Sequence, residues 1–258
     1  MAALLASAAF SASCSVGSQS DEAVEKTVFA MDTAVSFKGS SQDAEMAEEI
    51  LYRLDSLFDR YSEESDIYAI NNRMSCDISE DTENIIISAC ELSELYGSDV
   101  SIFGGSITDC WNINSENPTV PSDEEIEAAL DSFRKASFSL ETMSFADENG
   151  SIDLGSVAKG YAMDKIYEEL DSDSYYIVSA NSSILLNGEK PDGEPFIVSL
   201  RDPEGDGTLG TIRTEACFLS TSGGYERYFE ADGCRYSHIF ALNTGRPSET
   251  DLTSVTII

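Results

Sequence analysis

The sequence predicts an α+β fold: a single domain whose helices come early and whose strands form a mixed sheet late in the chain. Apolar residues recur at helical spacing between residues 41 and 61 and again between 81 and 96. After Phe138 the chain changes to short strand-like runs, which are separated by the turns Asn187-Gly188, Asp192-Gly193 and Asp232-Gly233. One further helix, ending near Leu170, crosses between the two halves. No convincing linker divides the chain, so one domain is expected.

Composition limits the possible partners. The chain has 258 residues, of which 41% are hydrophobic, enough for a substantial core. It carries 48 acidic against 15 basic residues, a net charge of −33, and such a surface repels nucleic acid and anionic membranes. We therefore expect no nucleic-acid partner. A nucleotide site in this chain would need local lysines, a helix N-terminus or a divalent metal, and a metal is the natural solution.

The first residues predict export and a lipid anchor. Residues 1–13 are small and apolar and end just before Cys14, as in a bacterial lipoprotein signal with Cys14 as the lipidated residue. Two features depart from that pattern: no Lys or Arg precedes the apolar segment, and Ser11 replaces the usual leucine. The alternative is an ordinary terminus. We expect a signal segment over 1–13, a polar tether over 14–25 and a folded domain over 26–258. The expected location is the cell envelope, lipid-anchored to the outer face of the cytoplasmic membrane or periplasmic.

Periodicity and punctuation predict the elements of the first half. Residues 27–37 alternate as a strand pair or as one strand with a bulge. The predicted helices are 41–61, a short turn over 65–71, 81–96 closed by Gly97, and 126–133 behind the Ser122 N-cap. Residues 98–111 are predicted as a glycine-containing loop that leads to Trp111. Five cysteines follow Cys14; their odd number and the lack of any Cys-x-x-Cys indicate neither a zinc site nor a disulfide framework.

The second half is predicted to be mostly strands. The expected strands are 138–140, 151–154, 175–178, 184–186, 196–200, 210–214, 216–221, 235–240 and 254–258. The last of them is apolar and β-branched with nothing after it, and a domain rarely ends inside a buried strand. We therefore expect the natural protein to continue beyond Ile258.

The stretch from Asp153 to Asp164 joins a strand-like run to a helix and is the best candidate for a binding site. Gly155 and Ser156 lie at the junction, where the first N–H groups of a helix have no carbonyl partners and attract anions. Lys159 adds a positive charge in the first turn, and Asp153 brings a carboxylate that suits a bound cation. A structural corner with a solvated lysine is an equally good explanation of this pattern on its own, because Gly-x-x-x-Lys is a weak motif.

Three further clusters have ordinary structural explanations when each is taken alone. Residues 58–71 place aromatic rings at a helix exit, and residues 220–229 form a small-residue loop that runs into aromatics. Residues 236–247 hold the only histidine, His238. Together and in this order, however, the clusters resemble the ApbE family, the FAD:protein FMN transferases of bacterial envelopes. The resemblance runs from Phe29 to Ile258 and implies a T-fold-related domain.

The motifs that carry the resemblance are jointly very specific. They are Asp-Leu-Gly-x-x-Ala-Lys-Gly-Tyr-Ala-x-Asp from Asp153, Thr-Ser-Gly-x-Tyr-Glu-Arg-Tyr-Phe around residues 221–229, and His-Ile-x-x-x-x-Thr-Gly-x-Pro from His238. The resemblance implies that FAD and Mg²⁺ bind at the first of these. It also implies that FMN is moved onto a Thr or Ser hydroxyl of an acceptor flavoprotein subunit of an envelope electron-transfer complex. Some relatives instead hydrolyse FAD to FMN and AMP.

The same resemblance assigns roles to individual residues. His238 matches the proposed catalytic histidine, and Ala158 matches a residue whose carbonyl binds the metal. Lys159 would offset the charge that develops on the pyrophosphate, beside Mg²⁺ and backbone N–H groups. The residues that match cofactor-binding positions are Met31, Tyr61, Gly97, Ser98, Asp99, Gly155, Tyr161 and Phe240. His238 could take the proton of the incoming hydroxyl, since an imidazole titrates near neutral pH.

Three departures from the family pattern keep alternatives open. The family's Gly-Gly-Asn turn is Asn181-Ser182-Ser183 here, and its Asp-Pro after the histidine is Ala241-Leu242. The family's metal-binding Asp and Thr would lie beyond the last strand of this chain. The leading interpretation is an Mg²⁺-dependent FMN transferase acting on an envelope redox protein. An FAD pyrophosphatase is the alternative among enzymes, and a non-catalytic flavin-binding lipoprotein is the alternative outside them.

Overall fold

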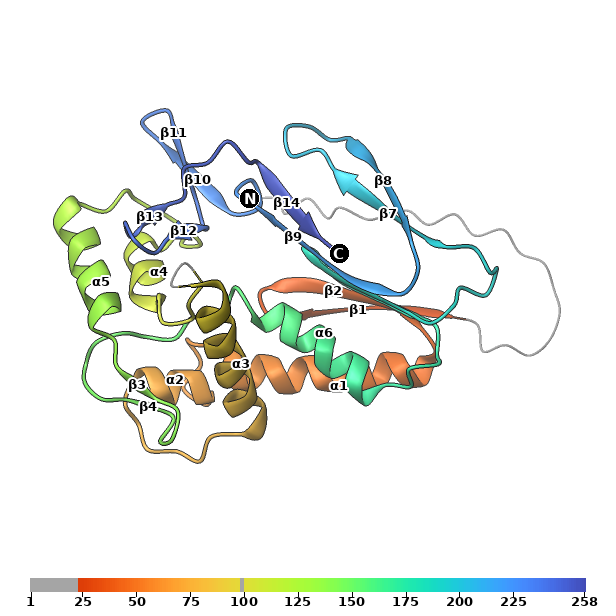
Figure 1. The fold of residues 1–258 in the computed structure, drawn as a ribbon, viewed down its shortest axis with the longest axis horizontal. Helices are drawn as coiled ribbons and strands as arrows, with labels where there is room; N and C mark the ends of the chain where they lie inside the picture. The colour runs from red at the N-terminus through yellow and green to blue at the C-terminus, as the bar shows by residue number, and fades with distance from the viewer. Residues whose placement is uncertain (1–22, 98–99) are drawn as a thin grey trace.

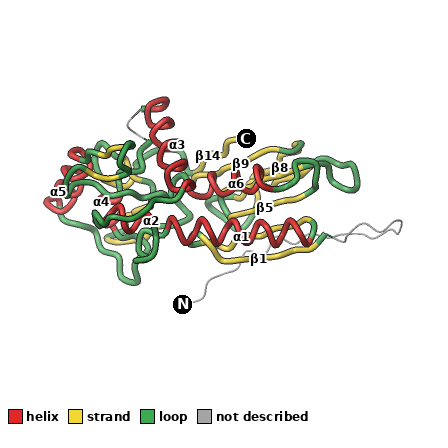
Figure 2. Tube along the Cα trace, turned by 90° about the horizontal axis from the view of Figure 1, so that it is seen from below, coloured by secondary structure: helices red, strands yellow, loops and turns green. Residues whose placement is uncertain are grey.

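One antiparallel sheet with two helices on one face forms the centre of the molecule (Figures 1 and 2). The computed structural model describes residues 23–97 and 100–258. The sheet has six strands in the order β1-β2-β5-β6-β9-β14, and every pair in it is antiparallel. We expected a mixed sheet with both parallel and antiparallel pairs, whereas this sheet is antiparallel throughout. The α+β class itself, with helices early and most strands late, is confirmed.

The chain enters the sheet through a tight hairpin. β1 (Val24–Ala30) and β2 (Thr33–Gly39) pair along their whole length, so of the two options for residues 27–37 the strand pair is correct. The two turn residues, Met31 and Asp32, have φ of 53° and 55°. Positive φ at both central positions gives the turn the twist that a two-residue hairpin needs. Non-glycine residues seldom adopt this conformation, so the hairpin holds Met31 in a defined and uncommon backbone position.

Helices α1 (Ser41–Phe58) and α6 (Ala158–Glu169) lie along one face of the sheet. Each buries one apolar stripe, as the 3.6-residue period predicts. Their buried side chains pack with those of β1, β2, β5 (Tyr176–Ala180) and β6 (Ser183–Asn187) in the main core: Val28, Val35, Phe37, Ile50, Leu51, Leu54, Met163, Ile166, Tyr176, Val178 and Leu185. The N-terminus of α6 therefore has a fixed position relative to the sheet.

A second body of helices lies beside one end of the sheet (Figure 1). It contains α4 (Gly105–Trp111) and α5 (Asp123–Lys135). By contrast, α2 (Asp66–Asn71) and α3 (Glu80–Tyr96) pack into the main core through Ile67, Ile70, Ile85, Ile86 and Ala89. A smaller core forms around Trp111, with Ile107, Ile113, Ile126, Leu130 and Phe229. Two short hairpins meet α4 and α5: β10 (Tyr228–Ala231) with β11 (Cys234–Ser237), and β12 (Phe240–Ala241) with β13 (Arg246–Pro247). Thus the second core brings the segment around His238 onto α4 and α5.

A hairpin covers part of the other face of the sheet, over β5, β6 and β9. β7 (Phe196–Arg201) and β8 (Thr208–Thr214) pair with each other, and Phe196 packs on Leu186 and Leu219. β9 (Cys217–Gly223) and β14 (Ser254–Ile257) complete the sheet. The remaining pair is β3 (Phe138–Ser139) with β4 (Ser144–Phe145). All five cysteines in the described part of the chain are free thiols, and no helix in that part is long and apolar enough to cross a bilayer.

Three local predictions and one boundary differ from the structure. Residues 105–111 form helix α4 rather than a loop. Residues 151–154 join no strand ladder; one isolated bridge links Ser151 to Gly104. Residues 235–240 are not one strand, because His238 lies between β11 and β12. β1 also begins at Val24, inside the segment 14–25 that we expected to be a tether. At residues 151–154 the partner that takes the place of a strand, the Asn71 side chain, lies far away in the sequence, which a local pattern does not contain.

Candidate active site

The N-terminus of α6 presents Lys159 to the sheet. Ala158 is the first residue of the helix, and its N–H donates to the Leu154 carbonyl at 2.8 Å. Serines cap α1, α2, α3 and α5, whereas no side chain caps α6. Lys159 is half-buried and its Nζ donates to Ser182 Oγ at 2.6 Å. Burial, together with the positive charge of Arg227, lowers the pKa of Lys159, while Glu226 opposes that change.

The departure at Asn181-Ser182-Ser183 leaves the turn intact. Asn181 takes φ of 57°, a conformation that glycine adopts freely and that asparagine tolerates better than most residues. Its Nδ2 donates to Glu226 Oε2 at 2.7 Å, which ties the β5–β6 turn to the loop after β9. Ser182 adds a hydroxyl where a glycine has none, and that hydroxyl holds Lys159. Ser182 therefore makes a side-chain contact with Lys159 that a glycine at this position could not make.

His238 is held by the chain just before β10. Its backbone N–H donates to the Arg227 carbonyl at 3.0 Å, and its ring Nδ1 lies 3.1 Å from the same oxygen. The largest effect on the pKa of His238 is partial desolvation of the ring by the surrounding chain, and this effect lowers the pKa. The charges of Arg227 and Lys159 lower it further, whereas the hydrogen bond to Arg227 and the charge of Glu226 act in the opposite direction. His238 and Lys159, predicted from motifs 79 residues apart, thus lie close enough to interact.

A pocket opens beside these groups. It has a volume of about 290 Å³ and is lined by Asp32, Asn114 and Arg227. Arg227 Nη2 donates to the Asp32 carbonyl at 3.1 Å, and the neighbouring Met31 N–H donates to Asp55 Oδ1 at 2.7 Å. The pocket therefore lies between the β1–β2 turn, which carries the predicted flavin contact Met31, and the loop that holds His238.

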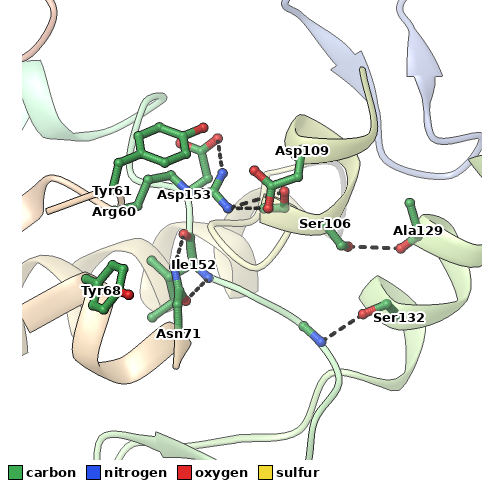
Figure 3. A network of polar contacts seen from close by, with 12 residues as sticks. Arg60, Tyr61, Tyr68, Asn71, Ser106, Asp109, Ala129, Ser132, Ile152 and Asp153 are labelled. Carbon is green, nitrogen blue, oxygen red and sulfur yellow. Dashed lines mark hydrogen bonds and ion pairs between the residues drawn. The ribbon is translucent and has the colours of Figure 1, made fainter. Parts of the chain in front are cut away.

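A partly buried arginine joins three segments next to Tyr61 (Figure 3). Arg60 makes ion pairs with Asp109 at 2.7 Å and with Asp153 at 3.4 Å, and it donates to the Gly105 carbonyl at 3.4 Å. Its guanidinium lies 5.4 Å from the centre of the Tyr61 ring, which is 67% exposed. The Tyr61 ring is thus held at the surface, where a planar ligand can stack on it. Asp153 Oδ1 also accepts the Gly155 N–H at 2.8 Å, which fixes the turn into α6.

Other predicted residues lie elsewhere. Tyr161 donates to Asp81 of α3 at 3.1 Å and packs edge-on against Phe58, and burial raises its pKa. Phe240 packs on Trp111 in the second core, with ring centres 6.3 Å apart. Gly97 ends α3 with φ of +88°. Ser98 and Asp99 lie outside the described residues. The cofactor-binding roles of all these residues remain predictions.

The described residues do not assemble a magnesium site. No group of three or more His, Cys, Asp or Glu side chains in this part of the chain is placed to hold a metal ion. Ala158 is 8% exposed and offers only its carbonyl, whereas Mg²⁺ needs near-octahedral oxygen coordination. The nearby carboxylates of Asp109 and Asp153 are paired with Arg60. The residues present therefore do not fit the ion by themselves.

Lys159 and His238 follow from their motifs, whereas the sequence alone predicts no role for Arg227 or Asn114. Arg227 falls within the motif around residues 221–229, and its positive charge in so acidic a chain is the feature that distinguishes it. Asn114 had no signal, since only the fold brings the loop after α4 to the β1–β2 turn.

Comparisons with known proteins agree with this geometry. The family model described as "ApbE family" matches residues 31–258. A protein of Vibrio cholerae named FAD:protein FMN transferase is 28% identical over 81% of this chain, which spans 66% of that relative's length. An Escherichia coli protein of the same name is 28% identical over 99% of this chain and 81% of its own. The crystal structure of the ApbE protein of Thermotoga maritima superposes with a TM-score of 0.82 at 33% identity, covering 91% of this chain and 81% of that one. The chain belongs to the ApbE family.

Proposed function

We propose that this protein transfers the FMN part of FAD to a Thr or Ser hydroxyl of an acceptor protein, with release of AMP. The observation that carries the proposal is the meeting of Lys159, Arg227 and His238 beside an uncapped helix N-terminus. In a chain of net charge −33, a local group of cations is the arrangement that a dianionic pyrophosphate requires. The names of the relatives support the same reaction.

His238 is the proposed general base. In the reaction the acceptor oxygen bonds to the flavin-side phosphorus of FAD, the bond to the bridging oxygen breaks, and AMP leaves with that oxygen. The hydroxyl proton goes to Nε2 of His238, because Nδ1 faces the Arg227 carbonyl. Since the pKa of His238 is lowered, the ring is already neutral at pH 7 and the base form is available. On acidification, activity should therefore persist down through pH 6.5, the ordinary pKa of histidine, and fall only at lower pH.

Lys159 and Arg227 are proposed to hold the pyrophosphate. Both carry charge next to His238, and Lys159 is oriented by Ser182 before any ligand arrives. Charge that increases on the phosphoryl oxygens during transfer is stabilised best by groups that need no rearrangement. Tyr61, exposed above Arg60, offers a ring on which the flavin could stack.

Magnesium, the lipid anchor at Cys14 and an acceptor from an envelope electron-transfer complex belong to the proposal through the motif resemblance. For Mg²⁺ the resemblance designates the Ala158 carbonyl, and one oxygen does not satisfy an ion of six ligands. We therefore assign no step of the reaction to the metal. Chelation with EDTA, followed by readdition of Mg²⁺, measures directly whether turnover depends on it.

FAD hydrolysis is the second candidate, and the exposure of His238 favours it. A base that solvent can reach can activate water as readily as an acceptor hydroxyl. The products would then be FMN and AMP, with no labelled protein. The two reactions share every residue named above, so only the fate of the flavin distinguishes them.

The test is to incubate the protein with FAD and an envelope protein fraction, and to measure AMP, free FMN and flavin fluorescence on a denaturing gel. We expect AMP release to match protein-bound flavin. His238→Ala should lower AMP release by about 10²–10⁴-fold, while Arg235→Ala, an exposed site in the β10–β11 hairpin, should not. Free FMN in place of bound flavin would establish the hydrolase. FAD binding without AMP release would overturn both enzymes and favour a flavin-binding protein.

A further inference from the structure

Arg227 contacts two parts of the candidate site at once. Its carbonyl accepts from the His238 backbone N–H at 3.0 Å and faces His238 Nδ1 at 3.1 Å. Its guanidinium donates to the Asp32 carbonyl at 3.1 Å and lines the pocket beside the β1–β2 turn. One residue therefore connects the histidine, the pocket and the hairpin that carries Met31.

The carbonyl contact determines which ring nitrogen of His238 carries the proton. A carbonyl oxygen has two lone pairs and can only accept hydrogen bonds, so the neutral ring must present N–H at Nδ1 to this oxygen. Nε2 is then the unprotonated nitrogen, free to accept a proton. The backbone N–H of the same residue uses the other lone pair, which fixes the orientation of the ring relative to its own main chain.

Packing on the other side keeps the Arg227 loop in place. A Cβ added at Gly224 would lie 3.3 Å from Cβ of Ser237, so the loop lies directly against the residue that precedes His238. Glu226 accepts from Asn181 at 2.7 Å. The guanidinium of Arg227 is the link on the pocket side, because it reaches the left-handed turn at Asp32.

We propose that Arg227 is a positioning residue for His238, whose carbonyl selects the Nδ1-protonated tautomer and whose guanidinium anchors that carbonyl to the β1–β2 turn. The role extends the proposed function, on which it rests only for the importance of His238 in transfer. A ligand bound against the β1–β2 turn would contact the same arginine that orients the base. Arg227 would therefore affect both ligand binding and proton transfer.

The charges around the ring give a second readout. The groups that act on His238 are Lys159 from α6 and Glu226 and Arg227 from the loop before β10. Removing the Arg227 charge takes away one of the two cations that disfavour the imidazolium. The histidine of such a variant should hold its proton to a higher pH.

The experiment uses the only histidine of the chain as its own reporter. ¹⁵N NMR spectra of the full chain without FAD, recorded across pH, give both the tautomer and the pKa of His238. We expect the Nδ1–H tautomer to dominate in the unmodified protein. Arg227→Met keeps an unbranched, though shorter, side chain and removes its charge and donors. In that variant the Nδ1–H population should fall, and the pKa of His238 should rise because one nearby positive charge is gone.

Two variants complete the design. Arg227→Lys retains a charge and a donor and should keep most of the Nδ1–H tautomer. Arg235→Met removes an arginine of the adjacent hairpin, which pairs with Glu230, and should leave the histidine spectrum unchanged. An Nε2–H tautomer in the unmodified protein would overturn the proposal. An unchanged tautomer in folded Arg227→Met would do so as well. These measurements need no turnover, so their result is independent of whether FMN transfer is ever observed.

Discussion

At the scale of single residues, the main core contains one polar atom that has no obvious purpose there. Tyr176 is fully buried and its ring stacks on Phe37, with ring centres 5.8 Å apart. Among the described residues its hydroxyl is the buried side-chain oxygen that lacks a hydrogen-bond partner. Burial, followed by the nearby charge of Asp43, raises the pKa of Tyr176 to about 12, so the hydroxyl stays neutral at any physiological pH. The stacked ring contributes packing, whereas the hydroxyl contributes a desolvation cost.

Tyr176→Phe should therefore not destabilise the protein. Removing an unpaired buried hydroxyl leaves the ring contacts in place and should raise the free energy of unfolding by up to about 1 kcal/mol. Urea denaturation followed by circular dichroism measures this change. Tyr175→Phe is the matched control, because its ring stacks on Phe196 on the other face of the sheet. A loss of more than about 1 kcal/mol in Tyr176→Phe would mean that the hydroxyl has a partner in solution.

At the scale of elements, the segment 151–154 shows how a side chain can replace a strand. Ile152 is fully buried, and its backbone groups pair with the side chain of Asn71 at the end of α2: Nδ2 donates to the Ile152 carbonyl at 2.9 Å, and the Ile152 N–H donates to Oδ1 at 2.7 Å (Figure 3). The amide thus satisfies both groups that a neighbouring strand would satisfy. This pairing places Asp153, one residue later, against Arg60.

Asn71→Ala should cost about 2–4 kcal/mol, because two buried backbone groups lose their partner together. The free energy of unfolding from urea titration is the measurement. Asn72→Ala removes an exposed amide from the same turn, one that donates to the Tyr68 carbonyl, and should cost less than about 1 kcal/mol. Equal costs in the two variants would contradict the strand-replacement role of Asn71.

The same elements show what local sequence could predict. The apolar run at 151–154 correctly indicated buried, extended backbone, but its partner is a side chain 81 residues away. Gly104 and Gly105 suggested a loop, yet α4 begins there. Glycine is required at 105 because an added Cβ would lie 2.8 Å from the Ser151 carbonyl oxygen and 2.9 Å from Arg60 Nη2. By contrast, α1 and α3 were predicted nearly to their ends from the apolar periodicity that runs through them.

At the scale of the whole molecule, charge opposes compactness. The 48 acidic residues outnumber the 15 basic ones, so there are too few cations to pair with most of the carboxylates. Surface ion pairs such as Lys135–Asp131 contribute at most about 1 kcal/mol each. Long-range repulsion over the surface is therefore the larger electrostatic effect, and it is the one that dissolved salt screens.

Raising NaCl from about 10 mM to about 0.5 M should increase the melting temperature by several degrees, because the Debye length falls from about 30 Å to a few ångströms. Differential scanning calorimetry gives the midpoint. MgCl₂ at matched ionic strength is the comparison, since a specific magnesium site would add stabilisation beyond screening. A midpoint that falls with NaCl would show that the ion pairs outweigh the repulsion.

The motifs predict which residues belong to the site but not how these residues are placed relative to one another in the whole molecule. Lys159 was predicted from its place at a helix start and from its motif, and His238 from its motif; the fold brings them close enough for the charge of Lys159 to act on the ring. Their mutual position depends on the β5–β6 turn, the loop before β10 and the β1–β2 hairpin, which meet only when the sheet forms. The contacts of Arg227, Asn114 and Ser182 with the site exist only after these segments have come together.

The chain has one tryptophan, and its surroundings make it a natural optical label. Trp111 is 1% exposed, and its indole N–H donates to the Gly245 carbonyl at 2.7 Å, in the segment that follows His238. Its emission wavelength therefore reports whether residues 240–247 are seated on α4. Because flavins absorb where buried indoles emit, a flavin bound nearby would dim that emission by energy transfer. The second core thus offers a way to watch cofactor arrival without adding a dye.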